Sequence, residues 1–422
     1  MAAKVAPESS YSNVALLKDE ESMMMLECEG ITTITFLKGD TDNAIKTLKS
    51  KFLEIARVNP WLTGRLKKDK KVEGGRLCIR HAVGEDNLAS LIEPLFAVDE
   101  TLTINSRMPY DQMSKVIKKS GSHIGKGTGL INKDAPFVRL TIAPQSPGES
   151  AIIFSLSHVV ADGFTYYKLV NMLGSKDVVS ELVAKRKEAE EARILDVVGK
   201  AQHLYQYSMG FCLPIVCGGM CCAPKTKMLA YYVDQEKIKD IRTNAVKGTT
   251  TERVSTNDVL TSGFGNAAGL NLLSMAINMR GRVEGLEATD AGNYESGLLF
   301  EPNSYANPTL IREVYTRGAP MSRAQNMPGV CHACCCCGCC RRKVGQITDW
   351  ASLHSDDFAI DGCEVLLHVP YMEDVGCDIA IPFKAQPGKL AVMYFAKYAK
   401  GDVLKSKCGL EAPVCMEMFP GS

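Results

Sequence analysis

Residues 150–174 constrain the fold of this chain more than any other stretch. Positions 151–156 are almost all apolar, which predicts a buried strand. The apolar residues within 164–173 have the spacing of the inner face of a helix. His158 and Asp162 lie between these two elements. Because a strand end fixes a side chain while the following loop exposes it, this junction predicts a functional site in an α/β fold.

The pattern His-x-x-x-Asp-Gly, formed by His158, Asp162 and Gly163, resembles the signature of the chloramphenicol acetyltransferase-like superfamily of acyl-CoA transferases. Within that superfamily it looks most like the plant-type BAHD acyltransferases. Further stretches follow the family's order over about residues 30–396. They are Asn-Pro-Trp-Leu-Thr-Gly-Arg-Leu at 59–66, Val-Ser-Thr-Asn-Asp-Val-Leu at 254–260, Asn-Met-Arg at 278–280 with Gly-Asn-Tyr at 292–294, and Thr-Asp-Trp at 348–350 with Asp-Phe-Ala-Ile-Asp-Gly at 357–362. Ala359 and Ile360 stand where the plant-type group has Gly and Trp.

The resemblance implies an α/β fold of two lobes that face one another across a tunnel, each lobe a mixed β-sheet flanked by helices. A length of 422 residues also favours two domains. We assign residues 1–195 to an N-terminal lobe and residues 227–422 to a C-terminal lobe. Residues 196–226 would form a crossover with a Cys-rich apolar patch, and a Cys-rich insertion would lie at about 326–345.

The expected chemistry centres on one histidine. Acyl transfer from a thioester needs a base near the acceptor proton, because an un-ionised hydroxyl is a poor nucleophile. Histidine suits this role, since its unperturbed pKa is about 6.5. The resemblance implies that His158 is the general base, that Thr348 donates a hydrogen bond to the oxyanion, and that Trp350 shapes the tunnel wall.

Other residues are expected to support this site. The resemblance implies that Asp162 turns away from the tunnel and pairs with Arg280, and that Asn293 helps to shape the site. Gly163 is expected to allow a tight turn where a Cβ would clash. No residues that hold coenzyme A can be named. We expect no metal and no permanently bound cofactor, with acyl-CoA as a co-substrate.

Local patterns predict how other elements begin and end. Asp42 is expected to cap the first long helix, and Thr256 a helix of the second half. Residues 178–205 predict one amphipathic helix whose charged face, which includes Arg186, is solvated. The glycine-rich stretch 121–129 lacks the spacing of a phosphate-binding loop and predicts a flexible loop.

The composition excludes some classes of function. Apolar residues make up 45% and charged residues 23% of the chain, as in soluble globular proteins. A formal net charge of +1 gives no field for nucleic acid. The N-terminal residues do not resemble a secretory leader, and no run approaches the roughly 20 apolar residues of a spanning helix. We therefore expect a cytoplasmic monomer whose 17 cysteines are mostly reduced.

Cysteines are concentrated at positions 331–340, beside the basic residues at 341–343. Three interpretations stay open: a low-complexity surface loop, S-acylated cysteines that dock on a membrane, and a metal site. Residues 209–222 form a second apolar patch with cysteines. Docking through these patches would make the protein peripheral to a membrane.

Together these patterns predict an acyl-CoA-dependent O- or N-acyltransferase that acts on a small-molecule alcohol or amine. One alternative is a wax-ester or glycerolipid acyltransferase of the same superfamily, although Ser157 stands where those enzymes usually have a second histidine. Condensation domains of peptide synthetases share the motif. The other alternative is a non-catalytic, membrane-associated binding or scaffold protein on this fold. The sequence identifies neither the acyl chain nor the acceptor.

Overall fold

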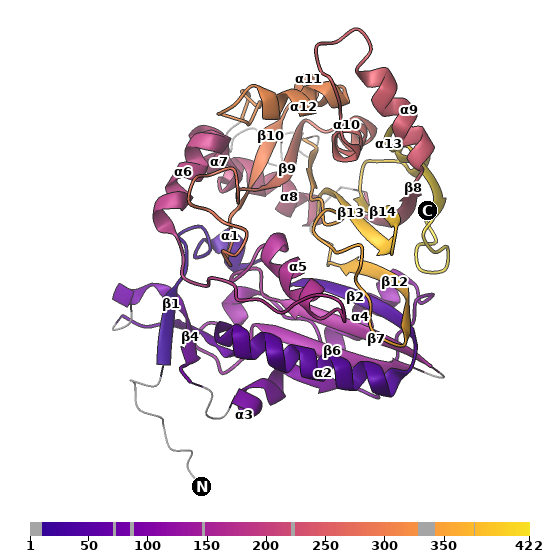
Figure 1. Cartoon of the computed structure of the whole chain (residues 1–422). Coiled ribbons are helices and arrows are strands. Elements are labelled where there is room, and N and C mark those ends of the chain that lie inside the picture. Colours follow the sequence, from indigo (N-terminus) through magenta and orange to yellow (C-terminus); the bar gives the residue numbers. More distant parts are fainter. Residues whose placement is uncertain are drawn as a thin grey trace.

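The computed structural model describes residues 11–70, 73–84, 88–145, 148–220, 224–327, 342–374 and 376–422. The cysteine cluster at 331–340 lies outside the described residues, and so do the interpretations attached to it. Two large β-sheets occupy opposite halves of the molecule, with a small third sheet beside the first (Figure 1). The architecture is a mixed α/β fold, as the sequence predicts.

The first sheet has five strands in the order β12-β2-β7-β6-β5. Their bounds are Cys363–Tyr371 (β12), Ile31–Gly39 (β2), Glu149–Leu156 (β7), Val138–Gln145 (β6) and Phe96–Val98 (β5). All neighbours are antiparallel except β5 and β6, which are parallel. The helices α2 (Thr41–Val58), α4 (Tyr110–Ser120) and α5 (Gly163–Met172) lie in this half (Figure 1). The strand β12 comes from late in the chain and completes this sheet. The division of the chain at residues 195 and 226 stays a prediction.

The second sheet has seven strands in the order β10-β9-β11-β13-β14-β8-β15. Their bounds are Glu295–Phe300 (β10), Leu272–Asn278 (β9), Val344–Ile347 (β11), Asp378–Gln386 (β13), Lys389–Ala396 (β14), Lys227–Val233 (β8) and Leu410–Pro413 (β15). The strand β11 is parallel to both of its neighbours, and the other pairs are antiparallel. The helices of this half are α9 (Gln235–Ala245), α10 (Thr256–Ala268), α11 (Pro302–Tyr305), α12 (Pro308–Thr316) and α13 (Gly401–Cys408).

The remaining elements include a three-stranded sheet in the order β1-β4-β3, formed by Tyr11–Ala15, Leu77–Ala82 and Arg65–Lys68. Short helices are α1 (Met23–Leu26) and α3 (Leu88–Ile92), together with the 3-10 turns η2 (Pro60–Thr63), η3 (Glu73–Gly75), η4 (Glu93–Leu95) and η5 (Gly127–Gly129). Between α5 and β8 in the sequence, the chain forms α6 (Glu188–Val198), α7 (Lys200–Gln206) and α8 (Met209–Met220). No helix within the described ranges is long and apolar enough to cross a membrane.

The second sheet separates the two main hydrophobic cores. Along β13, Ile379, Ile381 and Phe383 pack into the core of the first half, while Ala380 packs into the other core. The side chains of β14 alternate in the same way: Phe395 packs into the core of the first half, and the residues on either side of it pack into the other core. Side chains of a strand point alternately to its two faces, so a run that is apolar at every position is stable only when both faces are covered. These strands hold the two halves against one another.

Several local expectations are corrected. The caps of α2 and α10 are Asp40 and Ser255 rather than Asp42 and Thr256, because each side chain accepts from the backbone N–H three residues on. The stretch 178–205 is not one helix, since its helices begin only at Glu188 and break at Gly199, whose φ is +105°.

The glycine-rich stretch 121–129 is also more ordered than expected. The backbone N–H of Ile124 donates to the hydroxyl of Ser155, and the Ile124 carbonyl accepts from Gly30. The His123 ring is hydrogen-bonded to Thr32 and to Glu29. These bonds fix the stretch to two strands of the first sheet, and so they order it although it contains four glycines.

Candidate active site

His158 is held at the end of β7, an inner strand of the first sheet. The strand ends at Leu156, and the next residue donates its backbone N–H to the Phe137 carbonyl at 2.7 Å. Four residues after His158, Asp162 caps α5 by accepting from the N–H of Thr165 at 2.9 Å. The chain is therefore fixed on both sides of a short loop. The His158 side chain keeps 24% of its exposure, so the ring is held but reachable.

Asn293 fixes the orientation of the His158 ring. Its amide Nδ2 lies 3.0 Å from Glu20 Oε1 and 2.9 Å from the His158 carbonyl, both of which can only accept. The amide oxygen Oδ1 must therefore be the atom that faces His158 Nδ1, at 3.1 Å. An amide oxygen only accepts, so Nδ1 carries the proton of the neutral ring. This leaves the lone pair on Nε2, which is the form that a general base needs.

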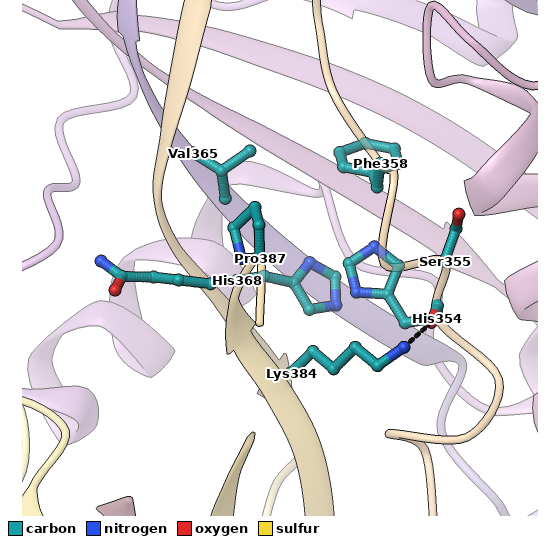
Figure 2. A pocket seen from close by; sticks show the side chains of 8 residues that line it. His354, Ser355, Phe358, Val365, His368, Lys384 and Pro387 are labelled. Carbon is teal, nitrogen blue, oxygen red and sulfur yellow. Dashed lines mark hydrogen bonds between the residues drawn. The ribbon is translucent and has the colours of Figure 1, made fainter. Parts of the chain in front are cut away.

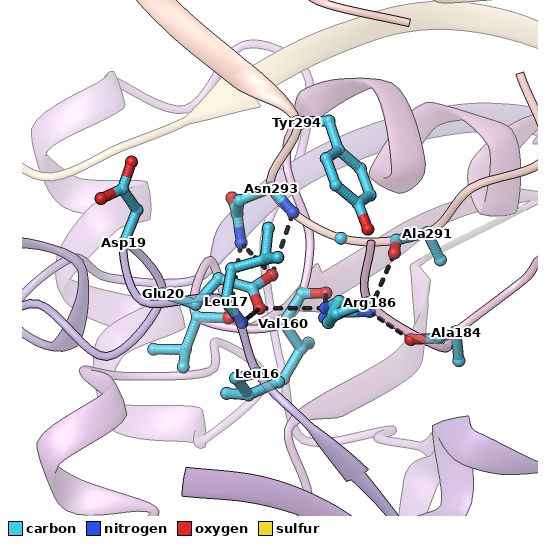
Figure 3. Close-up of polar contacts among 12 residues, drawn as sticks. Leu16, Leu17, Asp19, Glu20, Val160, Ala184, Arg186, Ala291, Asn293 and Tyr294 are labelled. Carbon is cyan, nitrogen blue, oxygen red and sulfur yellow. Dashed lines mark hydrogen bonds and ion pairs between the residues drawn. The ribbon is translucent and has the colours of Figure 1, made fainter. Parts of the chain in front are cut away.

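A buried ion pair lies behind Asn293 (Figure 3). Arg186 Nε is 2.9 Å from Glu20 Oε2, and the two side chains are 1% and 0% exposed. Arg186 also donates to the carbonyls of Val160 and Ala291, each at 2.8 Å. The prediction that Arg186 lies on a solvated helix face is wrong, because Arg186 precedes α6 and ties the loop after His158 to the segment before Asn293.

The residue Gly292 is required by this arrangement. Its φ is +136°, a conformation that side-chain-bearing residues rarely adopt, and an added Cβ would lie 2.9 Å from Arg186 Nε. The Gly-Asn pair of the sequence thus has a structural basis: Gly292 lets the arginine pass, and Asn293 then reaches the histidine.

A second buried ion pair, between Asp162 and Arg280, is present as the resemblance implied. Arg280 Nη1 is 2.6 Å from Asp162 Oδ2 and Nη2 is 3.3 Å from Oδ1, with side-chain exposures of 1% and 0%. Asp162 Oδ2 also accepts from the backbone N–H of Tyr294 at 3.0 Å. Arg280 donates to the carbonyls of Asp290 and Gly292 as well. The pair therefore joins the start of α5 to the segment that carries Asn293, and its carboxylate does not contact the His158 ring through any recorded bond.

Glu295 is the charged group next to the candidate base. Its Oε1 is 3.6 Å from His158 Nε2, and its side chain is 31% exposed. Burial raises the pKa of Glu295 and Asp162 adds to the rise, whereas His158 and Arg280 oppose it. Protein atoms surround the carboxylate on most sides although part of it stays reachable, so its charge is poorly solvated.

Thr348 and Trp350 follow β11. The Trp350 indole donates to the Thr348 hydroxyl at 3.2 Å, which leaves the hydroxyl proton of Thr348 free to donate elsewhere. The Trp350 ring packs edge-on against Tyr167 of α5, with ring centroids 5.9 Å apart. Trp350 thus connects this pair to α5. Among the described hydrogen bonds, none joins Thr348 to His158. Their roles in catalysis stay predictions.

The expected steric reason for Gly163 is wrong. The residue has no left-handed φ, and an added Cβ would approach Leu353 only to 3.6 Å and Trp350 Nε1 to 3.9 Å, which are ordinary contacts. The turn is made by the residues before Asp162, and Gly163 is simply the first residue of α5.

Apart from His158, a pair of histidines, His354 and His368, lines a small cavity (Figure 2). His354 and His368 have ring centroids 4.2 Å apart. Burial lowers the pKa of His354 to about 4, with Lys384 adding to the effect, and burial lowers the pKa of His368 well below its usual range. His368 bonds Thr35 and Tyr167, whereas both ring nitrogens of His354 lack a partner among the described residues.

Sequence reasoning missed Glu20, Arg186 and Glu295. Glu20 precedes every motif, and Arg186 sits in a run of charges that usually marks a solvated face. Glu295 could have been found, because it follows Gly292-Asn293-Tyr294 directly and is the one charged residue of the strand that it opens.

No family model and no curated protein sequence matches this chain. Solved structures do. TRI101 of F. sporotrichioides, crystallised with coenzyme A and T-2, has a TM-score of 0.58 at 12% identity, covering 96% of this chain and 100% of that one. The trichothecene 15-O-acetyltransferase TRI3 of Fusarium sporotrichioides has a TM-score of 0.55 at 9% identity, covering 96% and 94%. The first condensation domain of the CDA synthetase has a TM-score of 0.57 at 11% identity, covering 96% and 98%.

These likenesses cover nearly the whole of each chain and establish the fold. The protein has the two-lobed α/β fold shared by chloramphenicol acetyltransferase-like acyltransferases and condensation domains. The two-lobed α/β fold that the sequence motifs predicted is confirmed, and the tunnel between the lobes stays a prediction.

Proposed function

We propose that this protein transfers an acyl group from acyl-CoA to a hydroxyl or amine of a small molecule, with His158 as the general base. The observation that carries the proposal is the Asn293 amide, whose Oδ1 accepts from His158 Nδ1, so that the lone pair of the neutral ring lies on Nε2. A base of this kind is what acyl transfer to an alcohol or amine requires. The fold supports it, since TRI101 was crystallised with coenzyme A and T-2, and TRI3 is an acetyltransferase.

The chemical steps follow from the geometry. The acceptor donates its O–H or N–H to His158 Nε2 while its oxygen or nitrogen attacks the thioester carbon. The proton passes to Nε2, and the Nδ1–H bond to Asn293 holds the charged ring. Thr348 is the proposed hydrogen-bond donor to the oxyanion, and such a donor is worth about 2.7–4 kcal/mol. When the intermediate collapses, the C–S bond breaks and the thiolate takes the proton from His158.

The test measures thiol release from a panel of acyl-CoAs with mixed small alcohols and amines, and identifies the acylated products by mass spectrometry. Wild type should form acylated products, and His158→Ala should lower the rate by about 10²–10⁴-fold. Equal rates in the two proteins at the level of uncatalysed hydrolysis would contradict the proposal and favour a non-catalytic scaffold.

A further inference from the structure

The carboxylate of Glu295 faces the candidate base His158. An unprotonated Nε2 and an ionised carboxylate both accept hydrogen bonds. His158 Nε2 carries a lone pair, because Asn293 holds the ring proton on Nδ1. The carboxylate of Glu295 accepts only, and its Oε1 is 3.6 Å from that lone pair. When Nε2 is unprotonated and Glu295 is ionised, a group with several N–H donors can satisfy both acceptors at once. An acceptor substrate that reaches Nε2 must also come close to Glu295.

The other acids that bond near His158 have cations of their own. Asp162 is paired with Arg280, and Glu20 with Arg186, in fully buried ion pairs. Glu295 has no arginine or lysine partner among the described residues, and its one ionic contact there is with His158. The negative charge of Glu295 is therefore the one that a substrate can use.

Other carboxylates lie near the groups that surround Glu295. Burial raises the pKa of the Cys28 thiol to about 11, and the charges of Glu295, Glu29 and Glu27 add to the rise. Burial likewise raises the pKa of Tyr207, with further contributions from Asp19, Glu295 and Glu191. Glu295 and other carboxylates together raise the pKa values of both groups. A positively charged group would be attracted to the Glu295 carboxylate, because opposite charges attract.

On the basis of the acyl transfer proposed above, we propose that the acceptor is a primary amine that arrives as an ammonium ion and is bound by Glu295. An ammonium group has three N–H donors, so it can donate to the Glu295 carboxylate and to His158 Nε2 at once. A hydroxyl has a single proton and can satisfy only one of the two acceptors. Glu295 is thus the residue that selects amines over alcohols.

The reaction balances with one released proton. The bound ammonium first loses a proton to water, and the neutral amine then attacks the thioester carbon to form the C–N bond. His158 Nε2 takes the second proton from the nitrogen, the C–S bond breaks, and the thiolate takes that proton from His158. An ammonium ion and an acyl-CoA give an amide, free coenzyme A thiol and one proton.

The experiment uses matched acceptors, 2-phenylethylamine and 2-phenylethanol, together with hexylamine and hexan-1-ol, and the acyl-CoA that gives the fastest thiol release. Wild type is expected to acylate each amine with a kcat/KM at least tenfold above that of its alcohol. Glu295→Gln should raise the amine KM at least tenfold and lower the ratio of amine to alcohol kcat/KM at least tenfold. Glu252→Gln removes an exposed carboxylate elsewhere and is the matched control.

Three outcomes overturn the proposal in distinguishable ways. Equal or faster acylation of the alcohols by wild type contradicts amine selection while leaving acyl transfer intact. An equal loss for amines and alcohols in Glu295→Gln assigns the residue a general role in place of selection. Absence of any thiol release that depends on His158 removes the acyltransferase proposal itself, and the amine proposal with it.

Discussion

The molecule contains two imidazole centres that differ in how they are held. At His158, whose side chain is 24% exposed, one ring nitrogen is bonded to Asn293 and the other faces the carboxylate of Glu295. At the second centre the His354 and His368 rings pack against each other, and both residues are buried. The adjoining cavity measures about 10 Å³, room for about one water molecule.

The difference shows what makes a histidine available for chemistry. Burial strongly lowers the pKa of both His354 and His368, which on its own would suggest a functional site. Neither ring, however, has space beside it for a substrate. His158 instead combines a fixed ring, a free lone pair and access. A ring that is bonded at one nitrogen and reachable at the other, rather than a buried ring, distinguishes the candidate active centre.

The largest expected effect concerns the charges that support His158. Arg280→Met leaves the buried Asp162 carboxylate without its partner, and we expect it to lower the free energy of unfolding by about 3–5 kcal/mol. Urea denaturation followed by circular dichroism measures this. The double variant Asp162→Asn with Arg280→Met should lose less than the sum of the single changes. A single-variant loss below about 1 kcal/mol would show that the pair does not support the site.

The next effect concerns the orientation of the ring. Asn293→Ala removes the acceptor at His158 Nδ1, so the Nδ1–H tautomer is no longer enforced. We expect kcat to fall by about 10- to 100-fold, less than complete loss of the base, with little change in KM. Nitrogen-15 NMR of labelled histidine should show mixed tautomers in the variant. A retained Nδ1–H tautomer with unchanged kcat would mean that Asn293 does not position the ring.

The smallest effect concerns the second centre. Burial lowers the pKa of folded His354 from 6.5 to about 4, so the unfolded chain binds a proton more readily between these values and stability falls as the pH drops from 6.5 towards 4. His354→Leu also removes two unpartnered ring nitrogens, and we expect a gain of about 1 kcal/mol at pH 7. Urea titrations from pH 4 to 8 should show a shallower acid loss in the variant. A steeper acid loss, or a clear loss of stability at pH 7, would contradict this.

The sequence predicted well what is encoded locally. The strand β7 and the helix α5 follow from the apolar pattern around His158, and the order of the motifs predicted the two-lobed fold. The Asp162–Arg280 pair came from the resemblance, because its members are 118 positions apart and no local pattern joins them.

The sequence could not predict contacts that exist only after folding. Glu20 and Arg186 are 166 positions apart, and each looks like an ordinary surface charge. The strand β12 pairs with β2 across more than 300 residues, so its place in the first sheet has no local signal. The caps at Asp40 and Ser255 were each missed by one or two positions, because neighbouring residues of the same kind compete for the role.

The most direct test compares the two histidine centres in one assay. Initial rates of coenzyme A thiol release are measured at saturating acyl-CoA and acceptor for wild type, His158→Ala and His354→Ala. The account predicts a fall of about 10²–10⁴-fold for His158→Ala and a rate within about threefold of wild type for His354→Ala. A His158→Ala protein as fast as wild type, or a greater loss in His354→Ala, would contradict the assignment of His158 as the base.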